Sequence, residues 1–172
     1  MIYQCTKDML KSLKVEPEDY LEDYDDLYTW NVKKIRINRR HLVYLMNNAT
    51  KISVIFYGMT QKEYKNFDKI ANEGIRQVLI DGQVDDFLIE AYLKDVNKNL
   101  YTTVGSRRQM GVLNNAAYIT EYLFDDFQED SLLQRKMSYF QNKLLKKCEA
   151  ASGNAIPLTQ IKKMLKIKYK YS

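Results

Sequence analysis

The sequence predicts an α+β fold in which a mostly antiparallel sheet, a three-strand meander plus one or two further strands, packs against about four helices. Three consecutive segments are rich in β-branched and aromatic residues and are separated by turn-prone residues. The segments after Gly58 have apolar residues at helical spacing. With 172 residues, 45% of them hydrophobic, we expect one globular domain over residues 1–172, with 156–172 as a basic C-terminal extension.

The N-terminal residues predict a strand followed by a helix. Residues 1–5 have the content of a short strand, and Thr6 is a typical N-cap for a helix with Met9 and Leu10 inward. Residues 16–26 contain seven acids and few aliphatic side chains. We expect a solvated loop or a frayed helix there.

The three β-rich segments are residues 28–37, 41–46 and 52–57, and they predict an antiparallel meander. In the first segment the apolar residues change from even positions, such as Trp30, to odd positions, such as Ile35. This change predicts a bulge between them. The third segment is nearly all apolar, so we expect it in the centre of the sheet.

Helices are predicted from residue 60 onward, covering one side of the sheet. Thr60 and Glu63 have the spacing of a capping box that opens a helix ending at Gly82, and a second helix is expected over residues 85–95. Residues 100–104 could return to the sheet as a further strand.

Two long helices are predicted in the C-terminal part. One lies within residues 107–127, and the other runs over residues 131–149. After one or two helical turns, residues 166–171 alternate lysine with isoleucine or tyrosine, as an edge strand does. The inward residues of the helix over 131–149 are Leu133, Met137, Phe140, Leu144 and Cys148.

Charge is segregated along the chain. Residues 131–172 contain ten Lys or Arg and one acid, a net charge of +9, whereas the whole chain carries +5, so residues 1–130 carry −4. The two parts therefore present different fields to a partner.

The basic C-terminal face is one candidate binding site. It could follow a phosphate backbone, with Tyr139, Tyr169 and Tyr171 stacking on bases. The alternative is an ordinary solvated helix followed by an edge strand whose lysines prevent aggregation. The residues of this face are Arg135, Lys136, Lys143, Lys146, Lys147, Lys162, Lys163, Lys166, Lys168 and Lys170.

Two arginine pairs are further candidates. Arg39 and Arg40 lie in the predicted hairpin turn, and Arg107 and Arg108 lie at a helix start. The planar guanidinium suits phosphates and carboxylates, but turn arginines are also often simply solvated.

An acidic, tyrosine-rich segment suggests the opposite kind of contact. It could occupy a basic groove of another protein by resembling nucleic acid, or it could be a flexible acidic loop that improves solubility. Its residues are Tyr20, Glu22, Asp23, Tyr24, Asp25 and Asp26.

Catalytic signals are weak. Glu63 followed by Lys65 has the spacing of a nuclease motif, but the capping box explains Glu63 better. His41 is the single histidine and has no identified nucleophile, and Cys5 and Cys148 have no metal-site spacing. We therefore predict no catalytic residue, no metal and no cofactor.

Several short blocks resemble domain of unknown function 6933, an uncharacterised bacterial family. The blocks are Met1-Ile2-Tyr3-Gln4-Cys5-Thr6-Lys7, Trp30, Ile37-Asn38-Arg39-Arg40, Leu45-Met46-Asn47-Asn48-Ala49-Thr50, Phe56-Tyr57-Gly58 and Arg108-Gln109-Met110-Gly111-Val112-Leu113-Asn114. Where that family usually has a histidine after the tryptophan, this chain has Asn31, so no role of that histidine is implied. The resemblance implies a single intracellular domain, sometimes carried on mobile elements, and no reaction.

Together these features predict a non-enzymatic cytoplasmic binding or regulatory protein, encoded by a phage or mobile element. It would occupy a protein or protein–nucleic-acid complex, for example to inhibit a host defence complex. The alternative is a DNA- or RNA-binding module that uses the basic C-terminal face, and an unrecognised nuclease or hydrolase comes third. No apolar run approaches the length needed to span a membrane.

Overall fold

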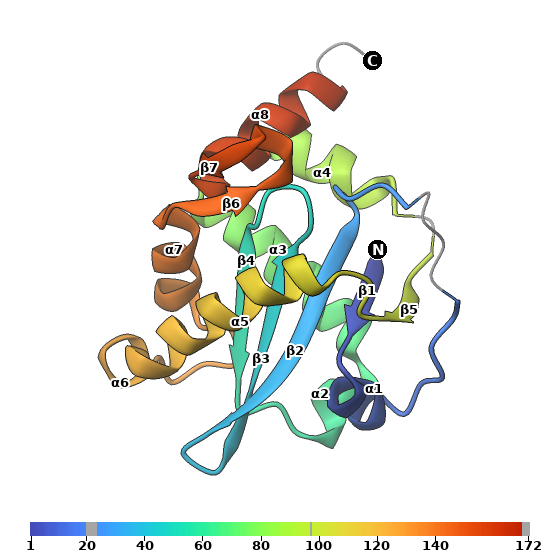
Figure 1. The fold of residues 1–172 in the computed structure, drawn as a ribbon, viewed down its shortest axis with the longest axis vertical. Helices are drawn as coiled ribbons and strands as arrows, with labels where there is room; N and C mark the ends of the chain where they lie inside the picture. The colour runs from blue at the N-terminus through green and yellow to red at the C-terminus, as the bar shows by residue number, and fades with distance from the viewer. Residues whose placement is uncertain (20–23, 97, 170–172) are drawn as a thin grey trace.

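The computed structural model describes residues 1–19, 24–96 and 98–169 (Figure 1). A five-stranded sheet in the order β4-β3-β2-β1-β5 forms its centre, and a two-stranded sheet pairs β6 with β7. This confirms the α+β class. The strands are β1 (Ile2–Cys5), β2 (Thr29–Ile37), β3 (Arg40–Asn47), β4 (Ser53–Tyr57), β5 (Leu100–Thr103), β6 (Lys146–Cys148) and β7 (Gly153–Ala155).

The main sheet is mixed rather than mostly antiparallel. β2, β3 and β4 form the predicted antiparallel meander, but β1 runs parallel to both of its neighbours, β2 and β5. A helix lies between β1 and β2, and three helices lie between β4 and β5. Such long connections allow a strand to return parallel to a neighbour, which a tight hairpin cannot do.

The predicted bulge in β2 is wrong. Pairing with β3 is uninterrupted from Trp30 opposite Asn47 to Ile37 opposite Arg40. The parity changes because the sheet is buried on both faces: Trp30 belongs to one hydrophobic cluster and Ile37 to the other. A strand that changes its buried face has the same sequence pattern as a bulge.

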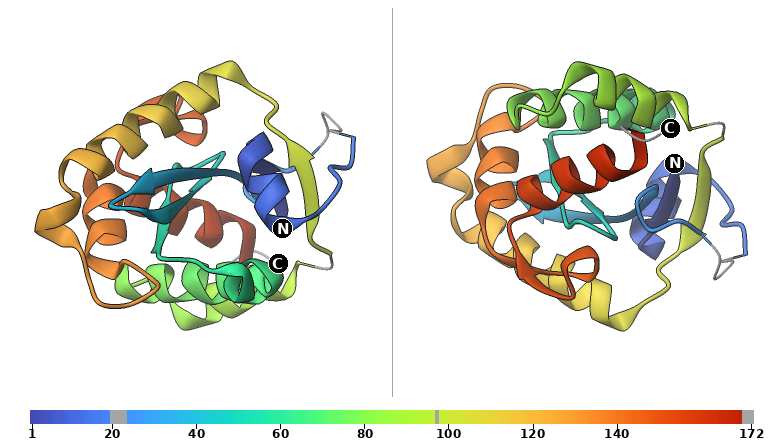
Figure 2. Two further views of the ribbon diagram at one scale, coloured as in Figure 1. Left: turned by 90° about the horizontal axis from the view of Figure 1, so that it is seen from below. Right: turned by 90° about the horizontal axis from the view of Figure 1, so that it is seen from above.

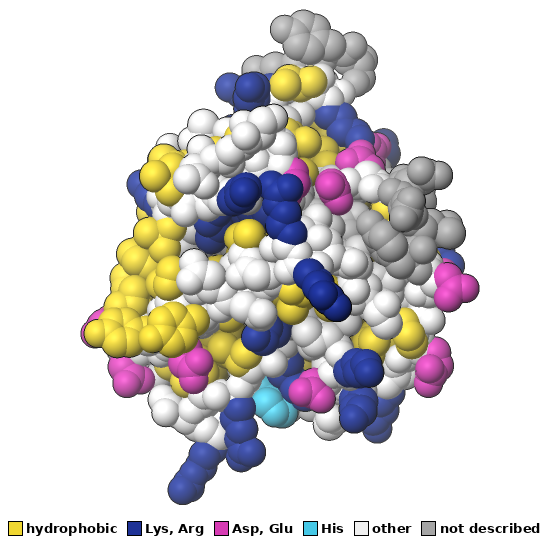
Figure 3. Space-filling view, viewed as in Figure 1, with side chains coloured by type: hydrophobic (Ala, Val, Ile, Leu, Met, Phe, Trp, Pro, Cys, Tyr) yellow, Lys and Arg dark blue, Asp and Glu magenta, His cyan; other side chains and the backbone are white. Residues whose placement is uncertain are grey.

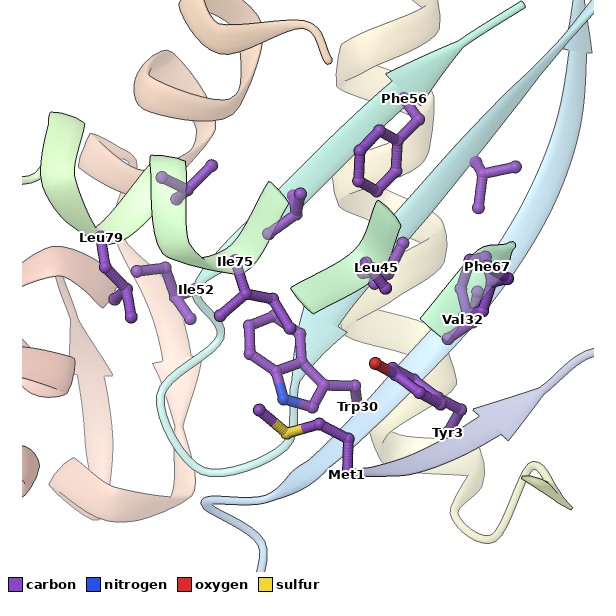
Figure 4. Close-up of a cluster of buried hydrophobic side chains, with 14 of the residues drawn as sticks. Met1, Tyr3, Trp30, Val32, Leu45, Ile52, Phe56, Phe67, Ile75 and Leu79 are labelled. Atoms are coloured by element: carbon purple, nitrogen blue, oxygen red, sulfur yellow. The ribbon is translucent and has the colours of Figure 1, made fainter. Parts of the chain in front are cut away.

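Helices cover both faces of the sheet, not one side as predicted (Figure 2). The first face packs around Tyr3, Trp30 and Phe67 (Figure 4). Its helices are α1 (Lys7–Leu13), α2 (Gln61–Lys65), α3 (Phe67–Asp81), α4 (Asp86–Lys94) and α8 (Pro157–Tyr169). The second face carries α5 (Arg107–Tyr122), α6 (Phe124–Phe127) and α7 (Arg135–Lys143). The described residues thus form eight helices, more than the four or so predicted.

β4 is an edge strand, not the central strand that its apolar sequence predicted. The segment that leads into α7 and α7 itself cover its outer edge. Asn142 of α7 accepts from the Ser53 amide at 2.6 Å and donates to the Ser53 carbonyl at 2.8 Å, and Ser138 Oγ accepts from the Ile55 amide at 3.1 Å. Side chains therefore satisfy the backbone groups that an edge would leave open.

The helix predicted over residues 131–149 is shorter. α7 ends at Lys143, Leu144 is already extended, and β6 follows. Leu144 and Cys148 share one side whether the chain is a helix or a strand, because four residues suit both periods. Apolar spacing alone could not separate the two conformations.

The C-terminal residues are helical. Residues 166–169 are the last turn of α8 rather than an edge strand, and Lys170 and Tyr171 lie outside the described residues. Leu158, Ile161 and Leu165 are buried in the main core, so the predicted basic extension is packed into the domain. Across the described ranges, no helix has the length and apolar character that crossing a membrane requires.

Candidate binding groove between α5 and β6

A buried polar cluster joins four segments that are distant in the sequence. The Asn48 amide donates to Gln4 Oε1 at 3.1 Å and to Asp26 Oδ1 at 3.3 Å. Asn31 Nδ2 donates to Asn48 Oδ1 and, at 3.1 Å, to Gln109 Oε1 at the start of α5. Four of these residues lie in, or directly beside, blocks that carry the family resemblance. The cluster ties the start of α5 to the turn between β3 and β4.

The same turn also holds the small β6–β7 sheet. The Ala150 amide of the 3-10 turn η1 (Glu149–Ala151) donates to the Ala49 carbonyl at 3.2 Å. Lys51 Nζ lies 2.5 Å from Glu149 Oε2, and Arg108 Nε lies 3.8 Å from Glu149 Oε1. The turn therefore positions α5 and β6 next to each other.

A groove of about 540 Å³ lies between α5 and the end of α7 with β6. Its surface is mostly apolar, and three basic residues, Arg108, Lys146 and Lys147, line it. The remaining lining residues are Gly111, Val112, Asn115, Ala116, Ile119, Gln141, Leu144 and Leu145. An apolar hollow with a few convergent polar groups is the usual form of a binding site.

Lys146 is buried in this groove, with 7% of its surface exposed. Its Nζ donates to the Gln141 carbonyl oxygen. Burial lowers the pKa of Lys146 from 10.5 to about 7, and the nearby Cys148 offsets this only in part. Desolvation has this effect because it disfavours the charged amine.

Gln141 supplies an unpaired acceptor at the same place. Its Nε2 donates to the Ala116 carbonyl at 3.2 Å and to Thr120 Oγ1 at 3.0 Å. Its Oε1 is buried and has no hydrogen-bond partner among the described residues. An unpaired buried acceptor of this kind is unusual in a folded protein.

The groove opens onto an exposed aromatic surface. Tyr118 and Tyr122 on α5 are 68% and 80% exposed, and Leu145 beside β6 is 70% exposed. Arg108, Asn115 and Tyr122 are spaced by seven residues and so share one face of α5. Figure 3 shows Lys and Arg side chains gathered between β6 and α5, and a hydrophobic band along the edge over α7 and the end of α5.

The structure does not form the single basic face that was predicted. Lys146 points inward because alternate residues of a strand face opposite sides, which puts it with Leu144 and Cys148. Arg135 is paired with Asp81 at 2.5 Å, and Lys168 is paired with Asp25 at 2.9 Å.

The other predicted basic residues are spread over separate places. Lys143 and Lys162 line a second hollow of about 360 Å³ between α7 and α8, where Lys143 Nζ lies 4.6 Å from the Tyr139 ring centre. Arg39 and Arg40 are exposed at the end of the β2–β3 hairpin, far in sequence from the groove. The exposed side chains elsewhere are Arg107, Lys136, Lys163 and Lys166. Lys147 is exposed at the groove, and Lys170 lies outside the described residues.

The acidic segment is described only in part. Tyr20, Glu22 and Asp23 lie outside the described residues. Asp25 pairs with Lys168 and accepts from the Leu27 amide at 2.9 Å, and Asp26 bonds Asn48. Asp26 thus binds the turn between β3 and β4, and Asp25 binds α8, so both carboxylates make contacts within this chain.

The weak catalytic candidates have structural roles. Glu63 Oε2 accepts from the Thr60 amide at 2.8 Å, which confirms the capping box. The half-buried His41 ring packs edge-on near Tyr64, and burial with Lys34 and Arg36 lowers its pKa. Within the described ranges, no group of three or more His, Cys, Asp or Glu side chains could hold a metal ion.

Sequence reasoning missed Gln141, Leu145 and the aromatic surface of α5. One signal was available: if residues 144–148 alternate as a strand, Lys146 shares the side of two apolar residues. Nothing in the sequence indicated that Gln141 lines a groove, because a glutamine on a predicted helix does not show what packs against it.

The model of domain of unknown function DUF6933 matches residues 2–157. The match covers the whole groove and ends where α8 begins. No curated protein and no solved structure matches the chain. With the family model matching more than half of its length, the chain belongs to the DUF6933 family.

Proposed function

We propose that this chain is a non-enzymatic binding protein that occupies a protein partner. In this proposal, the groove between α5 and β6 receives an apolar side chain of the partner next to an acidic group. One observation carries the proposal: apolar walls and the cations Arg108 and Lys147 meet in one open groove. A segment with an apolar residue beside Asp or Glu complements both.

The surroundings of the groove favour a protein over nucleic acid. Tyrosine and other large apolar groups are enriched in protein interfaces, and Tyr118, Tyr122 and Leu145 are among the most exposed apolar side chains described. Nucleic acid would instead need a continuous cationic track. Around the groove the exposed cations are few, and the carboxylate of Glu149 lies 3.8 Å from one of them, Arg108, so they do not form such a track.

A steric test uses Gly111. A Cβ at this position meets no atom within 4 Å, so Gly111→Ala leaves the groove open whereas Gly111→Trp fills it. The probe is a displayed library of random peptides panned on the wild-type chain. We expect enrichment of peptides with an apolar residue beside Asp or Glu, which bind Gly111→Ala normally and Gly111→Trp at least tenfold more weakly. Enriched peptides that bind both variants equally would exclude the groove.

A charge test uses two matched double variants. The first variant combines Arg108→Glu with Lys147→Glu, and the second combines Lys136→Glu with Lys166→Glu. Both change the net charge equally, but only the residues of the first variant line the groove. We expect the first variant to lose the selected peptides and the second to keep them. Equal losses would mean that only the overall charge matters.

A second candidate function rests on the hollow between α7 and α8. Tyr139, 40% exposed, lies there with Lys143 and Lys162, and stacking beside cations is how single strands are bound. Lys143→Glu with Lys162→Glu should then abolish a mobility shift of single-stranded DNA or RNA at low salt, while Arg108→Glu with Lys147→Glu should not. No shift with the wild-type chain would remove this candidate.

The setting of the protein remains a prediction. A mobile-element origin and a host complex as target follow from the resemblance and from the segregated charge. The residues of the acidic segment that lie outside the described ranges could contribute a second contact to the same partner.

A further inference from the structure

Two lysines are buried among the residues that the structure describes, and their surroundings differ. Lys51, 1% exposed, has Glu149 Oε2 2.5 Å from its ammonium group and donates to the Asn48 carbonyl. Lys146, 7% exposed, has no ion pair among the described residues and donates to one carbonyl, that of Gln141. A buried ammonium group is compensated in the first case and not in the second.

The residues that line the groove with Lys146 come from three elements. α5 contributes the cation Arg108, the end of α7 contributes the neutral Gln141, and β6 contributes Lys147, while Cys148 is the titratable neighbour of Lys146. Neither α5 nor α7 places a carboxylate in the groove lining. Because burial lowers the pKa of Lys146 to about 7, a large share of its amine is neutral at pH 7, and the neutral nitrogen has a free electron pair.

We propose that Lys146 is a nucleophilic amine that reversibly captures the carbonyl group of a small apolar molecule carrying a carboxylate or phosphate. The apolar walls of the groove would hold the body of the molecule, and Arg108 and Lys147 would attract its anionic group. The proposal goes beyond the binding of a protein segment, since it needs the groove but no peptide.

The reaction needs no further reagent. The Nζ electron pair attacks the carbonyl carbon, a C–N bond forms, and the carbonyl oxygen gains a proton as the nitrogen loses one. The resulting carbinolamine releases its oxygen as water and leaves a C=N bond to Lys146. Hydrolysis reverses both steps, so capture is an equilibrium. Buried lysines in apolar pockets react in this way because they are neutral near pH 7.

The test uses 4-carboxybenzaldehyde, which combines an aldehyde, an apolar ring and a carboxylate. With cyanoborohydride present, each C=N bond becomes a stable amine that peptide mapping by mass spectrometry can locate. At pH 7 we expect Lys146 to be labelled ~10-fold or more faster than any exposed lysine, because far more of its amine is neutral. Benzaldehyde, which lacks the carboxylate, should label Lys146 more slowly, and benzoate should protect it.

Variants of the groove show whether labelling of Lys146 depends on an open groove. Gly111→Trp should block labelling of Lys146 and Gly111→Ala should not, while Lys147→Met should reduce the rate several-fold without moving the label. Labelling of Lys146 no faster than that of exposed Lys163 and Lys166 would overturn the proposal, as would a rate indifferent to Gly111→Trp. If labelling fails while selected peptides still distinguish the two Gly111 variants, the reactive lysine is wrong and the proposed function stands.

Discussion

At the scale of single residues, the environment of a side chain rather than its type decides its role. Lys51 and Lys146 are both buried, yet one holds η1 to the β3–β4 turn and the other lines an open groove. Lys51 is paired with the Glu149 carboxylate 2.5 Å away. Lys146 has no such carboxylate among the described residues, so its protonated form lowers the stability of the fold.

Replacing Lys146 tests this cost. Between about pH 7 and 10.5 the unfolded chain binds the Lys146 proton and the native chain does not, so the stability of the wild type rises with pH in that window. We expect Lys146→Met to be more stable than the wild type at pH 7, by a few kcal/mol, and to lack this part of the rise. Urea unfolding at several pH values measures both.

The difference between the two proteins is the informative quantity. The N-terminal amine, whose pKa burial lowers to about 6, titrates in both chains and cancels. A difference in unfolding free energy that stays constant from pH 7 to 10 would contradict the neutral buried lysine.

At the scale of elements, side chains of α7 complete a sheet edge. Asn142 is fully buried and bonds both backbone groups of Ser53, so it replaces the neighbouring strand that β4 lacks. This explains why an edge strand can have an almost entirely apolar sequence: both its faces and its edge are covered.

Asn142→Ala should therefore be costly. It leaves the Ser53 amide and carbonyl buried without partners, and we expect a loss of about 2–3 kcal/mol in unfolding free energy. Exposed Asn115 on α5 provides the control, since Asn115→Ala should change stability by less than about 0.5 kcal/mol. Comparable losses in thermal or urea unfolding would show that the Asn142 contacts contribute nothing specific.

Two helical glycines should respond in opposite directions. A Cβ on Gly74 of α3 would lie 2.4 Å from Phe56 Cζ, whereas one on Gly111 meets nothing within 4 Å. We expect Gly74→Ala to destabilise the protein by about 1–3 kcal/mol and Gly111→Ala to stabilise it by about 0.5–1 kcal/mol. Urea midpoints of the two variants decide, and a stable Gly74→Ala would mean that Phe56 can move aside freely.

At the scale of the whole molecule, α8 closes the core. Its residues Leu158, Ile161 and Leu165 are buried against the first face of the sheet, and Lys168 and Tyr169 contact Asp25 and Asp95. The family match ends at residue 157, yet most of this helix lies beyond it. The packing of the domain thus extends past the matched region.

A chain ending at residue 156 should not fold cooperatively. Each of the three buried side chains of α8 contributes about 1.5–3 kcal/mol, and their sum approaches the total stability of a typical domain. We expect the shortened chain to lose its sigmoidal unfolding transition and to bind a dye for exposed apolar surface. A shortened chain that unfolds as sharply as the full chain would show that α8 is dispensable.

Much of the local structure could be predicted from the sequence. The meander, the capping box of Thr60 and Glu63 and the helix over residues 85–95 depend on residues that are close together in the chain. Periodicity and turn chemistry describe such short-range preferences well. The basic residues of the groove were also named from the sequence, Lys146 and Lys147 as members of one basic face and Arg108 as part of an arginine pair at a helix start.

The sequence alone determined which segments form strands and helices over most of the chain, and that the chain resembles the DUF6933 family. Only the tertiary structure decided that β1 lies parallel between β2 and β5, that both faces of the sheet are buried, and that Lys146 points into a groove. The reason is physical: local preferences depend on neighbours in the chain, whereas the side that a residue buries depends on what packs there from elsewhere. Leu144 and Cys148 face inward in either conformation, and contacts with distant segments set the environment of the lysine between them.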